Sequence, residues 1–289
     1  MIDGDKVANV IIEIMQENVS ELGEIIAVDG KAIRSTSEKG KPHSALQILS
    51  AYMTGSGITI AQKSIHEKTN EIPVFQEMLD SLNVKNKTIT ADAMHCQTKT
   101  CAKIVKKQGD YVFGLKQNQP NFYEDVDLYF KENYAKFETF STTEKSHGRI
   151  ETRTCYKFDD IGRLSMKKEW SGLKSVFAVK LITKQKSGTS EEVSYYISSL
   201  DETPKKLMTI VREHWKIESL HWLLDVTFSE DECRVISENG LKTLNIFRKL
   251  ALFLHRRFME CQTKKKSLKG NILGCLINDD LLVRVVASL

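Results

Sequence analysis

The sequence lacks several features that would place the protein in a membrane, a secretory pathway or a zinc-binding class. No stretch approaches the roughly 18 consecutive apolar residues that predict a membrane-spanning helix. The acidic first residues lack the basic region with which a signal peptide begins. The six cysteines form no CxxC pair, and no histidine pair has zinc-binding spacing. We therefore expect a soluble, cytoplasmic protein with reduced thiols and no membrane partner.

Proline is also scarce, and neither an internal repeat nor a low-complexity linker marks a domain boundary. The chain has 289 residues, of which four are proline and 41% are apolar, so it can bury one large core or two ordinary ones. Its net charge of +4 permits a polyanionic partner without requiring one.

The charge is unevenly distributed along the chain. Residues 1–24 hold six acidic residues and one lysine, whereas the stretch "FRKLALFLHRRFMECQTKKKSLKG" holds one acidic residue among its many Lys and Arg. Such a basic run is more often a solvated helix face than a binding surface, but a second nucleic-acid signal would favour DNA binding.

The first half of the sequence predicts a mixed sheet flanked by helices. After a helix at "DKVANVIIEIMQEN", the stretches "EIIAVDGKAIRST", "ALQILSAYMT" and "GITIAQKSIH" predict three strands, the last two forming a hairpin across Gly55–Gly57. Helices at "IPVFQEMLDSLN" and "TKTCAKIVKKQ" then alternate with strands at "KTITADAMH" and "DYVFGLK". A meander followed by alternating helices and strands is typical of the α/β class.

The second half begins with a β-rich segment and ends in helices. "GRIETRTCYKF", "SVFAVKLITKQ" and "EEVSYYISSL" are rich in β-branched and aromatic residues, which predicts strands. Pro204 suits a first helical turn, and helices are expected from there to about residue 260. We expect an N-terminal helix (1–24), the first part of a core (25–139), a β-rich insertion (140–203), helices completing the core (204–260) and a basic C-terminal segment (261–289).

Three acidic residues are candidates for a functional site. Asp29 and Asp92 each follow an apolar strand ("IIAVD", "TITAD"), and ligands bind at such strand ends in α/β sheets. One such aspartate alone is more often a turn or capping residue. Glu218 falls at helical spacing within an apolar stripe that includes Trp215 and Trp222, so we expect it on the dry side of its helix. A carboxylate there requires a cation or hydrogen bonds, which points to a metal, an arginine or a proton.

Three converging carboxylates would repel one another, and Mg²⁺ is the usual cation that makes such a cluster tolerable. Two ions about 3.5–4 Å apart can activate a water or a 3′-hydroxyl at a phosphodiester, which is nuclease or strand-transfer chemistry. Three downstream acidic residues, Asp225, Glu230 and Asp231, compete with Glu218 for the third position in the cluster. Asp225 could instead support Glu218, because it lies on the same helix face.

The spacing of Glu218 and His221 also fits one half of a di-iron site, but such a site needs a matching copy on a second helix. Glu144 and His147 have that spacing, yet Gly148 follows them and the sequence beyond is strand-like. The di-iron alternative is therefore disfavoured.

Further polar residues could contact DNA or could only face solvent. His147, Arg149 and Arg153 share one side of an extended segment, where arginines can clamp phosphates. Lys116 and Asn118 lie in a polar loop after a strand and are similarly ambiguous. The other candidates for DNA contact lie next to the three acidic residues and are Lys31, Arg34, Arg212, His214 and Trp215.

The chain resembles a known family over residues 25–255 through six blocks that occur in order. These blocks are "IAVDGKAIRST", "TITADAMHCQ", "GDYVFGLKQNQ", "HGRIETR", "YYISSL" and "REHWKIESLHWLLDVTFSEDECR". It resembles the ISAs group of insertion-sequence DDE transposases, which includes the H-repeat-associated proteins. The resemblance implies an RNase H-like α/β fold, with a mixed five-stranded sheet flanked by helices and a β-rich insertion before the last catalytic helix. It also implies that Asp29, Asp92 and Glu218 are the catalytic triad and bind two Mg²⁺ or Mn²⁺ ions.

The sequence departs from that family in two respects. Related transposases place a tyrosine and an arginine before the glutamate and a lysine after it, whereas this chain has His214 four residues before and Asp225 seven residues after. His221 and Asp225 are therefore expected to support the site rather than to contact DNA. Family members also usually carry a further segment before the first strand, so we expect a truncated or decayed element that transposes poorly.

The leading function is a metal-dependent DDE transposase, which cleaves and transfers strands at insertion-sequence ends. Its partners would be transposon-end and target DNA, with a homodimer as the active form. The alternative is a catalytically inactive DNA-binding remnant or regulator of a degenerate element, which would bind metal without cutting transposon ends. A structure-specific nuclease is a third possibility, distinguished by products that contain no joined strands.

Overall fold

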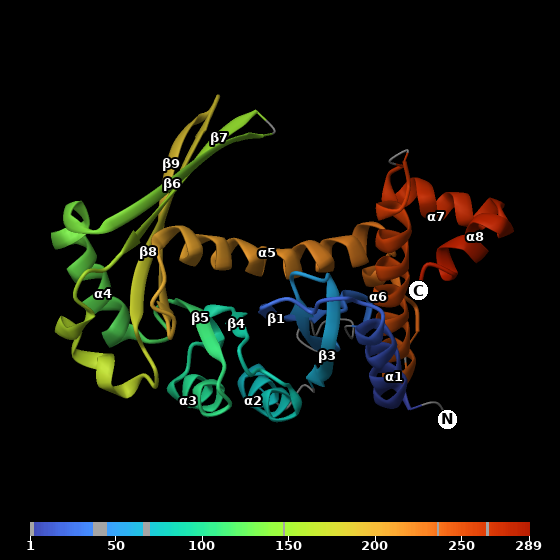
Figure 1. Cartoon of the computed structure of the whole chain (residues 1–289), viewed down its shortest axis with the longest axis horizontal. Helices are drawn as coiled ribbons and strands as arrows, with labels where there is room; N and C mark the ends of the chain where they lie inside the picture. Colours follow the sequence, from blue (N-terminus) through green and yellow to red (C-terminus); the bar gives the residue numbers. More distant parts are fainter. Residues whose placement is uncertain (1–2, 37–44, 66–69, 147, 236, 264–265) are drawn as a thin grey trace. The chain divides into compact units, whose positions relative to one another are not determined.

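The computed structural model (Figure 1) describes residues 3–36, 45–65, 70–146, 148–235, 237–263 and 266–289. The α-helices within these ranges are α1 (Gly4–Glu17), α2 (Glu71–Ser81), α3 (Thr98–Lys106), α4 (Pro120–Asn133), α5 (Pro204–Val226), α6 (Glu238–Glu260), α7 (Leu268–Ile277) and α8 (Asp279–Val286). The strands are β1 (Ile25–Ala32), β2 (Gln47–Met53), β3 (Ile58–Ile65), β4 (Thr88–Ala91), β5 (Asp110–Leu115), β6 (Glu138–Ser146), β7 (Arg149–Lys157), β8 (Ser175–Gln185) and β9 (Gly188–Ser198).

The chain divides into two compact units, which we describe separately. Unit 1 contains residues 1–24, 29–74 and 216–289, and unit 2 contains residues 25–28 and 75–215. Strand β1 and helix α5 each contribute residues to both units.

Unit 2 is built on parallel strands that continue into a long antiparallel array. The first four residues of β1 pair in parallel with β4, and β4 pairs in parallel with β5. Strand β5 then pairs antiparallel with β9, and the array continues through β8 and β7 to β6, drawn in Figure 1 as long curved ribbons. Buried β-branched and aromatic residues supply the inner positions of the central strands, including Ile89, Val112, Phe113, Val176 and Phe177.

The expected five-stranded sheet is wrong in its strand number. Over the described residues the sheet has nine strands, in the order β3-β2-β1-β4-β5-β9-β8-β7-β6. The reason is the register of β9, in which Tyr195 to Ser198 pair with Leu115 to Val112. The β-rich segment therefore adds strands to the sheet instead of folding apart from it.

The β-rich segment also packs against the first half of α5. Val112, Phe177 and Val179 lie in one buried cluster with Leu207 and Ile210 of that helix. Burying a Leu, Ile, Val or Phe side chain stabilises a fold by about 1.5–3 kcal/mol. This cluster fixes the rotation of α5 about its own axis, and so decides which of its residues face outward.

Unit 1 combines α1, the β2–β3 hairpin and the C-terminal helices. Helices α1 and α6 lie side by side (Figure 1), and a Cβ at Gly4 would come within 2.7 Å of the Asn239 carbonyl oxygen, so this helix contact requires glycine. Helices α7 and α8 pack on α6 through Phe258, Cys275 and Val285.

The cysteines and the helix hydropathy can also be stated. All six cysteines are free. In the part of the chain that the structure describes, no helix combines the length and the apolar character needed to cross a bilayer.

Candidate active site

The first two candidate acidic residues follow a pair of parallel strands at matching positions. Val28 of β1 is in register with Ala91 of β4, and Asp29 and Asp92 are the next residues along each chain. Pairing between the two strands is recorded from Ile25↔Thr88 to Val28↔Ala91, so both aspartates come directly after the last paired positions. This is the carboxyl end of the β1–β4 ladder, and ligands of α/β proteins bind at such ends.

Asp29 is paired with a histidine within unit 1. Its Oδ2 lies 3.2 Å from Nδ1 of His221 on α5, and the Asp29 side chain is only 19% exposed. Strand β1 continues past Asp29 to Ala32, so the expected end of the strand at Asp29-Gly30 is wrong. The Glu71 carboxylate lies close to Gly30, because a Cβ there would come within 2.8–3.0 Å of it.

Asp92 has a histidine neighbour of its own within unit 2. Its Oδ1 lies 3.8 Å from Nε2 of His214, while Nδ1 of the same ring lies 3.1 Å from the Thr90 hydroxyl. The interaction with His214 holds the pKa of the Asp92 carboxyl below its usual range, against the opposing effect of partial burial. The Asp92 side chain is 62% exposed and is therefore accessible to a ligand from solvent.

The expected orientation of Glu218 on its helix is wrong. Trp215 and Trp222 are 58% and 60% exposed, and Glu218 shares this exposed face. The buried stripe of α5 instead runs through Ile210, Ile217 and Leu224, which have no exposed surface. The two tryptophans were counted as core residues because they are apolar, and this rotated the predicted stripe away from the true one.

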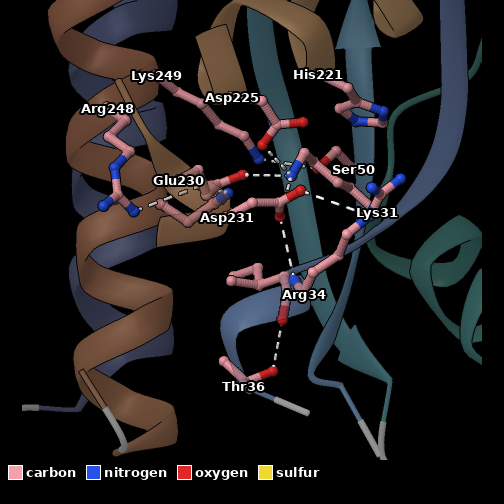
Figure 2. Close-up of polar contacts among 12 residues, drawn as sticks. Lys31, Arg34, Thr36, Ser50, His221, Asp225, Glu230, Asp231, Arg248 and Lys249 are labelled. Carbon is pink, nitrogen blue, oxygen red and sulfur yellow. Dashed lines mark hydrogen bonds and ion pairs between the residues drawn. The ribbon is translucent and has the colours of Figure 1, made fainter. Parts of the chain in front are cut away.

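A cluster of charged residues that includes Lys31, Asp225, Glu230 and Asp231 lies near His221 (Figure 2). Lys31 follows Asp29 by two residues on β1, and its Nζ lies 2.7 Å from Asp225 and 3.2 Å from both Glu230 and Asp231. Burial alone would lower the pKa of the Lys31 amine, but these three carboxylates outweigh burial and raise it. Asp225 is one helical turn after His221, so β1 and α5 are joined by two successive contacts, Asp29–His221 and Lys31–Asp225.

Helix α6 completes this cluster. Glu230 has no exposed surface, accepts a hydrogen bond from Asn245 Nδ2 at 2.8 Å and lies 3.6 Å from Arg248 Nη1. Lys249 is also buried, donates to the Ser50 hydroxyl and the Gln62 side chain, and burial lowers the pKa of its amine to about 8. The sequence predicts Glu230 only as a possible metal ligand and does not predict its contact with Arg248 or the burial of Lys249. The basic stretch that contains both residues is the one feature of the sequence that marks them.

The loop residues expected to contact DNA differ in their surroundings. The Lys31 amine is buried among carboxylates and is a poor candidate for a phosphate contact. Arg34, in contrast, is 86% exposed and lies 3.6 Å from Asp231. Lys116 and Asn118 are exposed, and Asn118 donates a 2.7 Å hydrogen bond to the Ala93 carbonyl next to Asp92.

The arginines of unit 2 are held by carboxylates. Arg212 of α5 makes a two-point contact with Glu144 of β6, at 2.6 Å and 3.2 Å. Arg153 pairs with Glu144 and with Glu151, and Arg149 lies 2.7 Å from Glu151. His147 was also a candidate, but it lies outside the described residues.

The donor groups at the strand ends fit a hard divalent cation. Mg²⁺ and Mn²⁺ prefer oxygen ligands, and Asp29 and Asp92 are carboxylates that each follow a residue of the last β1–β4 pair. Within the described ranges no group of three or more His, Cys, Asp and Glu side chains is arranged to hold a metal ion. The carboxylate chemistry of each aspartate suits such an ion.

Comparison with known proteins decides the family. The model of the transposase DDE domain family matches residues 20–254 of this chain. The chain belongs to the transposase DDE domain family. The expected resemblance to H-repeat-associated insertion-sequence DDE transposases is confirmed, because the relatives include proteins whose names carry that description.

Individual relatives match the chain over much of its length. YncI of Escherichia coli O157:H7, which is named as a transposase, is 35% identical over 99% of this chain and 75% of its own length. The H repeat-associated protein YhhI of Escherichia coli K12 is 36% identical over 79% of this chain, and the match covers 63% of YhhI, less than two thirds of its length. A piggyBac transposase structure is similar over 93% of this chain and 62% of its own, with a TM-score of 0.42 and 13% identity.

Proposed function

We propose that this DDE-family protein cleaves and transfers DNA strands at insertion-sequence ends, with Asp29, Asp92 and Glu218 as the catalytic triad. The observation that carries the proposal is the register of β1 and β4, in which an aspartate directly follows each residue of the last pair, Val28 and Ala91. Membership of the DDE family supports the same assignment, since the matched residues 20–254 include all three acidic residues.

We further propose that the triad carboxylates hold Mg²⁺ or Mn²⁺, in a two-ion arrangement. When bound, such ions activate a water or a 3′-hydroxyl and stabilise the leaving oxygen of a phosphodiester. Cleavage and strand transfer are both displacements at phosphorus, so one acidic site can serve both steps.

The histidines of α5 are proposed to orient the two aspartates. His221 Nδ1 faces Asp29 at 3.2 Å, and the Thr90 hydroxyl fixes the ring of His214 beside Asp92. Outer partners of this kind orient metal-binding carboxylates, and losing one typically costs about 10- to 100-fold in metal affinity or activity. Asp225 contributes indirectly, by anchoring the same turn of α5 to Lys31.

The proposed fold assignment follows from the strand order. Strands β1 to β5 and the helices between them, together with α5, would form the RNase H-like core, and β6 to β9 would form the insertion. The proposal also includes transposon-end and target DNA as partners, a homodimer as the active form, and the cytoplasmic location expected from the sequence.

The proposal is tested by nicking of a supercoiled plasmid or a transposon-end duplex in Mn²⁺. We expect Asp29→Asn and Asp92→Asn each to lower the nicking rate by about 100-fold or more, beyond the 10- to 100-fold expected for loss of an outer partner in His221→Gln. Asp201→Asn is a matched control, because Asp201 is a 69% exposed carboxylate that pairs with Lys157. Metal binding without nicking by the wild type would favour an inactive DNA-binding remnant, and nicking without joined products would favour a nuclease.

A further inference from the structure

A basic cavity in unit 1 is lined in part by α5 and has no role in the proposed chemistry. It has a volume of about 880 Å³ and is lined by the β2–β3 turn, by α5 and by α6. Its cationic residues are Lys216, Arg256 and Arg257, and two carboxylates, Glu21 and Glu260, also reach its wall. Three cations against two carboxylates leave the lining with a net positive charge.

The contacts of Arg256 leave its charge available to a ligand. Its Nη1 donates a 3.0 Å hydrogen bond to the Tyr52 hydroxyl, which is a neutral acceptor. Among the residues that the structure describes, no carboxylate lies within ion-pairing distance of this guanidinium. Guanidinium groups bind phosphate through two parallel N–H donors, so Arg256 is held in place while retaining donors for an anion.

Arg257 is also held by an uncharged group, because its guanidinium lies over the Phe253 ring at 5.5 Å. A cation held by an aromatic ring keeps its full charge. Arg256 and Arg257 thus differ from Lys31 and Arg248 in the neighbouring cluster, which are both paired with carboxylates. Lys216 adds a further cation to the wall of the cavity, where its Nζ donates to the Thr54 carbonyl at 3.3 Å.

The β2–β3 turn leaves space at the rim of the cavity. Gly57 has a φ of +73°, and a Cβ there would lie 3.4 Å from the Tyr52 hydroxyl and 3.5 Å from Arg256 Nη1. A side chain at Gly57 would therefore crowd the Tyr52–Arg256 pair as well as strain the backbone. Ser56 beside it is partly exposed, with its hydroxyl bonded to the Leu22 carbonyl at 3.1 Å.

The position of the cavity on α5 relates it to the proposed site. Lys216 and Ser219, which line the cavity, lie two residues before and one residue after Glu218 on the same helix. Trp222 is 60% exposed and lies one turn beyond both Glu218 and Ser219. Ser219 of the cavity wall and Glu218 thus share Trp222 as a neighbour on the helix surface, whereas Lys216, two residues before Glu218, lies on a different side of α5.

We propose that this basic cavity binds the phosphodiester backbone of the DNA on which the proposed site acts; the inference rests on the proposed function. Phosphate contacts position a nucleic acid without reading its sequence, so the cavity would hold the DNA in place irrespective of sequence. A free phosphate or a nucleotide carries the same phosphate group, and the experiment below distinguishes them from DNA as the ligand.

The test is fluorescence anisotropy of a labelled duplex of arbitrary sequence, measured in EDTA over a series of KCl concentrations. Removing one phosphate contact should lower the slope of log affinity against log salt by about one. We expect Arg256→Gln to show this smaller slope and a several-fold loss of affinity at low salt. Ser56→Glu, which places a carboxylate at the rim, should weaken binding at least as much.

Arg163→Gln is the matched control, because Arg163 is a 69% exposed arginine in unit 2 that pairs with Asp160, and it should bind like the wild type. Circular dichroism melting checks that each variant is folded. Unchanged slope and affinity in both cavity variants would overturn the proposal, as would displacement of the duplex by inorganic phosphate at constant ionic strength.

Because EDTA prevents chemistry, the binding result is independent of nicking. Arg256-dependent binding by a wild type that does not nick in Mn²⁺ would refute the proposed catalysis while leaving the cavity as a DNA site. Nicking by the wild type together with DNA binding that does not depend on Arg256 would support the proposed catalysis and refute the cavity as a DNA site.

Discussion

Replacing Lys31 with methionine should lower the free energy of unfolding more than replacing an exposed cation that pairs with the same acidic residues. The substitution removes an amine that lies 2.7 Å from Asp225 and 3.2 Å from both Glu230 and Asp231, and keeps most of the aliphatic volume. Breaking a buried ion pair by removing one partner costs about 3–5 kcal/mol, because a charge remains without compensation. Asp225 and Asp231 are 33% and 25% exposed and can regain water, whereas Glu230 is fully buried, so we expect a loss of about 3 kcal/mol, at the lower end of that range.

Urea unfolding at neutral pH, followed by far-ultraviolet circular dichroism, measures this loss. Arg34→Met is the matched control, because Arg34 lies 3.6 Å from Asp231 but is 86% exposed, and exposed pairs are worth less than about 1 kcal/mol. The double variant Lys31→Met with Glu230→Gln should recover part of the loss, since it removes the uncompensated buried charge. Equal effects of Lys31→Met and Arg34→Met would refute the electrostatic account of this cluster.

Two further predictions concern buried and exposed side chains. The pKa of Lys249 is about 8 in the folded chain, and its ordinary value is 10.5. Between these pH values the unfolded chain binds a proton that the folded chain has released. The free energy of unfolding should therefore rise with pH over this range, by about 3 kcal/mol. Lys249→Met should remove this rise, which urea midpoints of both proteins at about pH 8 and pH 10 would show. Acrylamide should quench the fluorescence of Trp215 and Trp222, which are more than half exposed, while Trp170, 3% exposed, remains protected. Single Trp→Phe variants assign each fluorescence component to its residue. A wild type with only one quenchable tryptophan would contradict the exposed face of α5.

Local patterns in the sequence predicted most elements of the fold. The stretches expected to form the β2–β3 hairpin, β4, β5 and helices α2 and α3 all do so. Helix α5 begins at Pro204 as expected. These predictions succeed because hydrophobic period, glycine turns and proline at a first helical turn are properties of neighbouring residues.

Strand β6 was not predicted, and its contacts explain why. Its sequence ETFSTTEKS contains no buried residue, so it has no alternation of apolar and polar positions from which a strand could be inferred. It is held by pairing with β7, including hydroxyl contacts from Ser141 to Thr154 and from Thr143 to Thr152. An exposed edge strand of this kind depends on a partner that its own sequence does not indicate.

The charged cluster was beyond prediction for a related reason. Lys31 contacts carboxylates about 200 positions away, and Lys249 contacts Ser50 at a similar separation. Spacing along a chain reports on neighbours within one element and carries no information about partners on another. The resemblance to a family supplied the triad, but it did not indicate which of the nearby acidic residues are neutralised by buried cations.

That distinction between acidic residues bears on which of them would hold the proposed metal ions. Asp225, Glu230 and Asp231 are all compensated by Lys31, and Glu230 also by Arg248. Asp29 and Asp92 instead have imidazole neighbours, which can hydrogen bond to a carboxylate as neutral groups, whereas Lys and Arg are cationic. A carboxylate that is ion-paired with a buried Lys or Arg has less affinity left for a divalent ion, whereas the ion-pair partners of Asp29 and Asp92 in the described part of the chain are imidazoles. The partners of each acidic residue, more than its position in the sequence, therefore favour Asp29 and Asp92 over the downstream acidic residues as ligands.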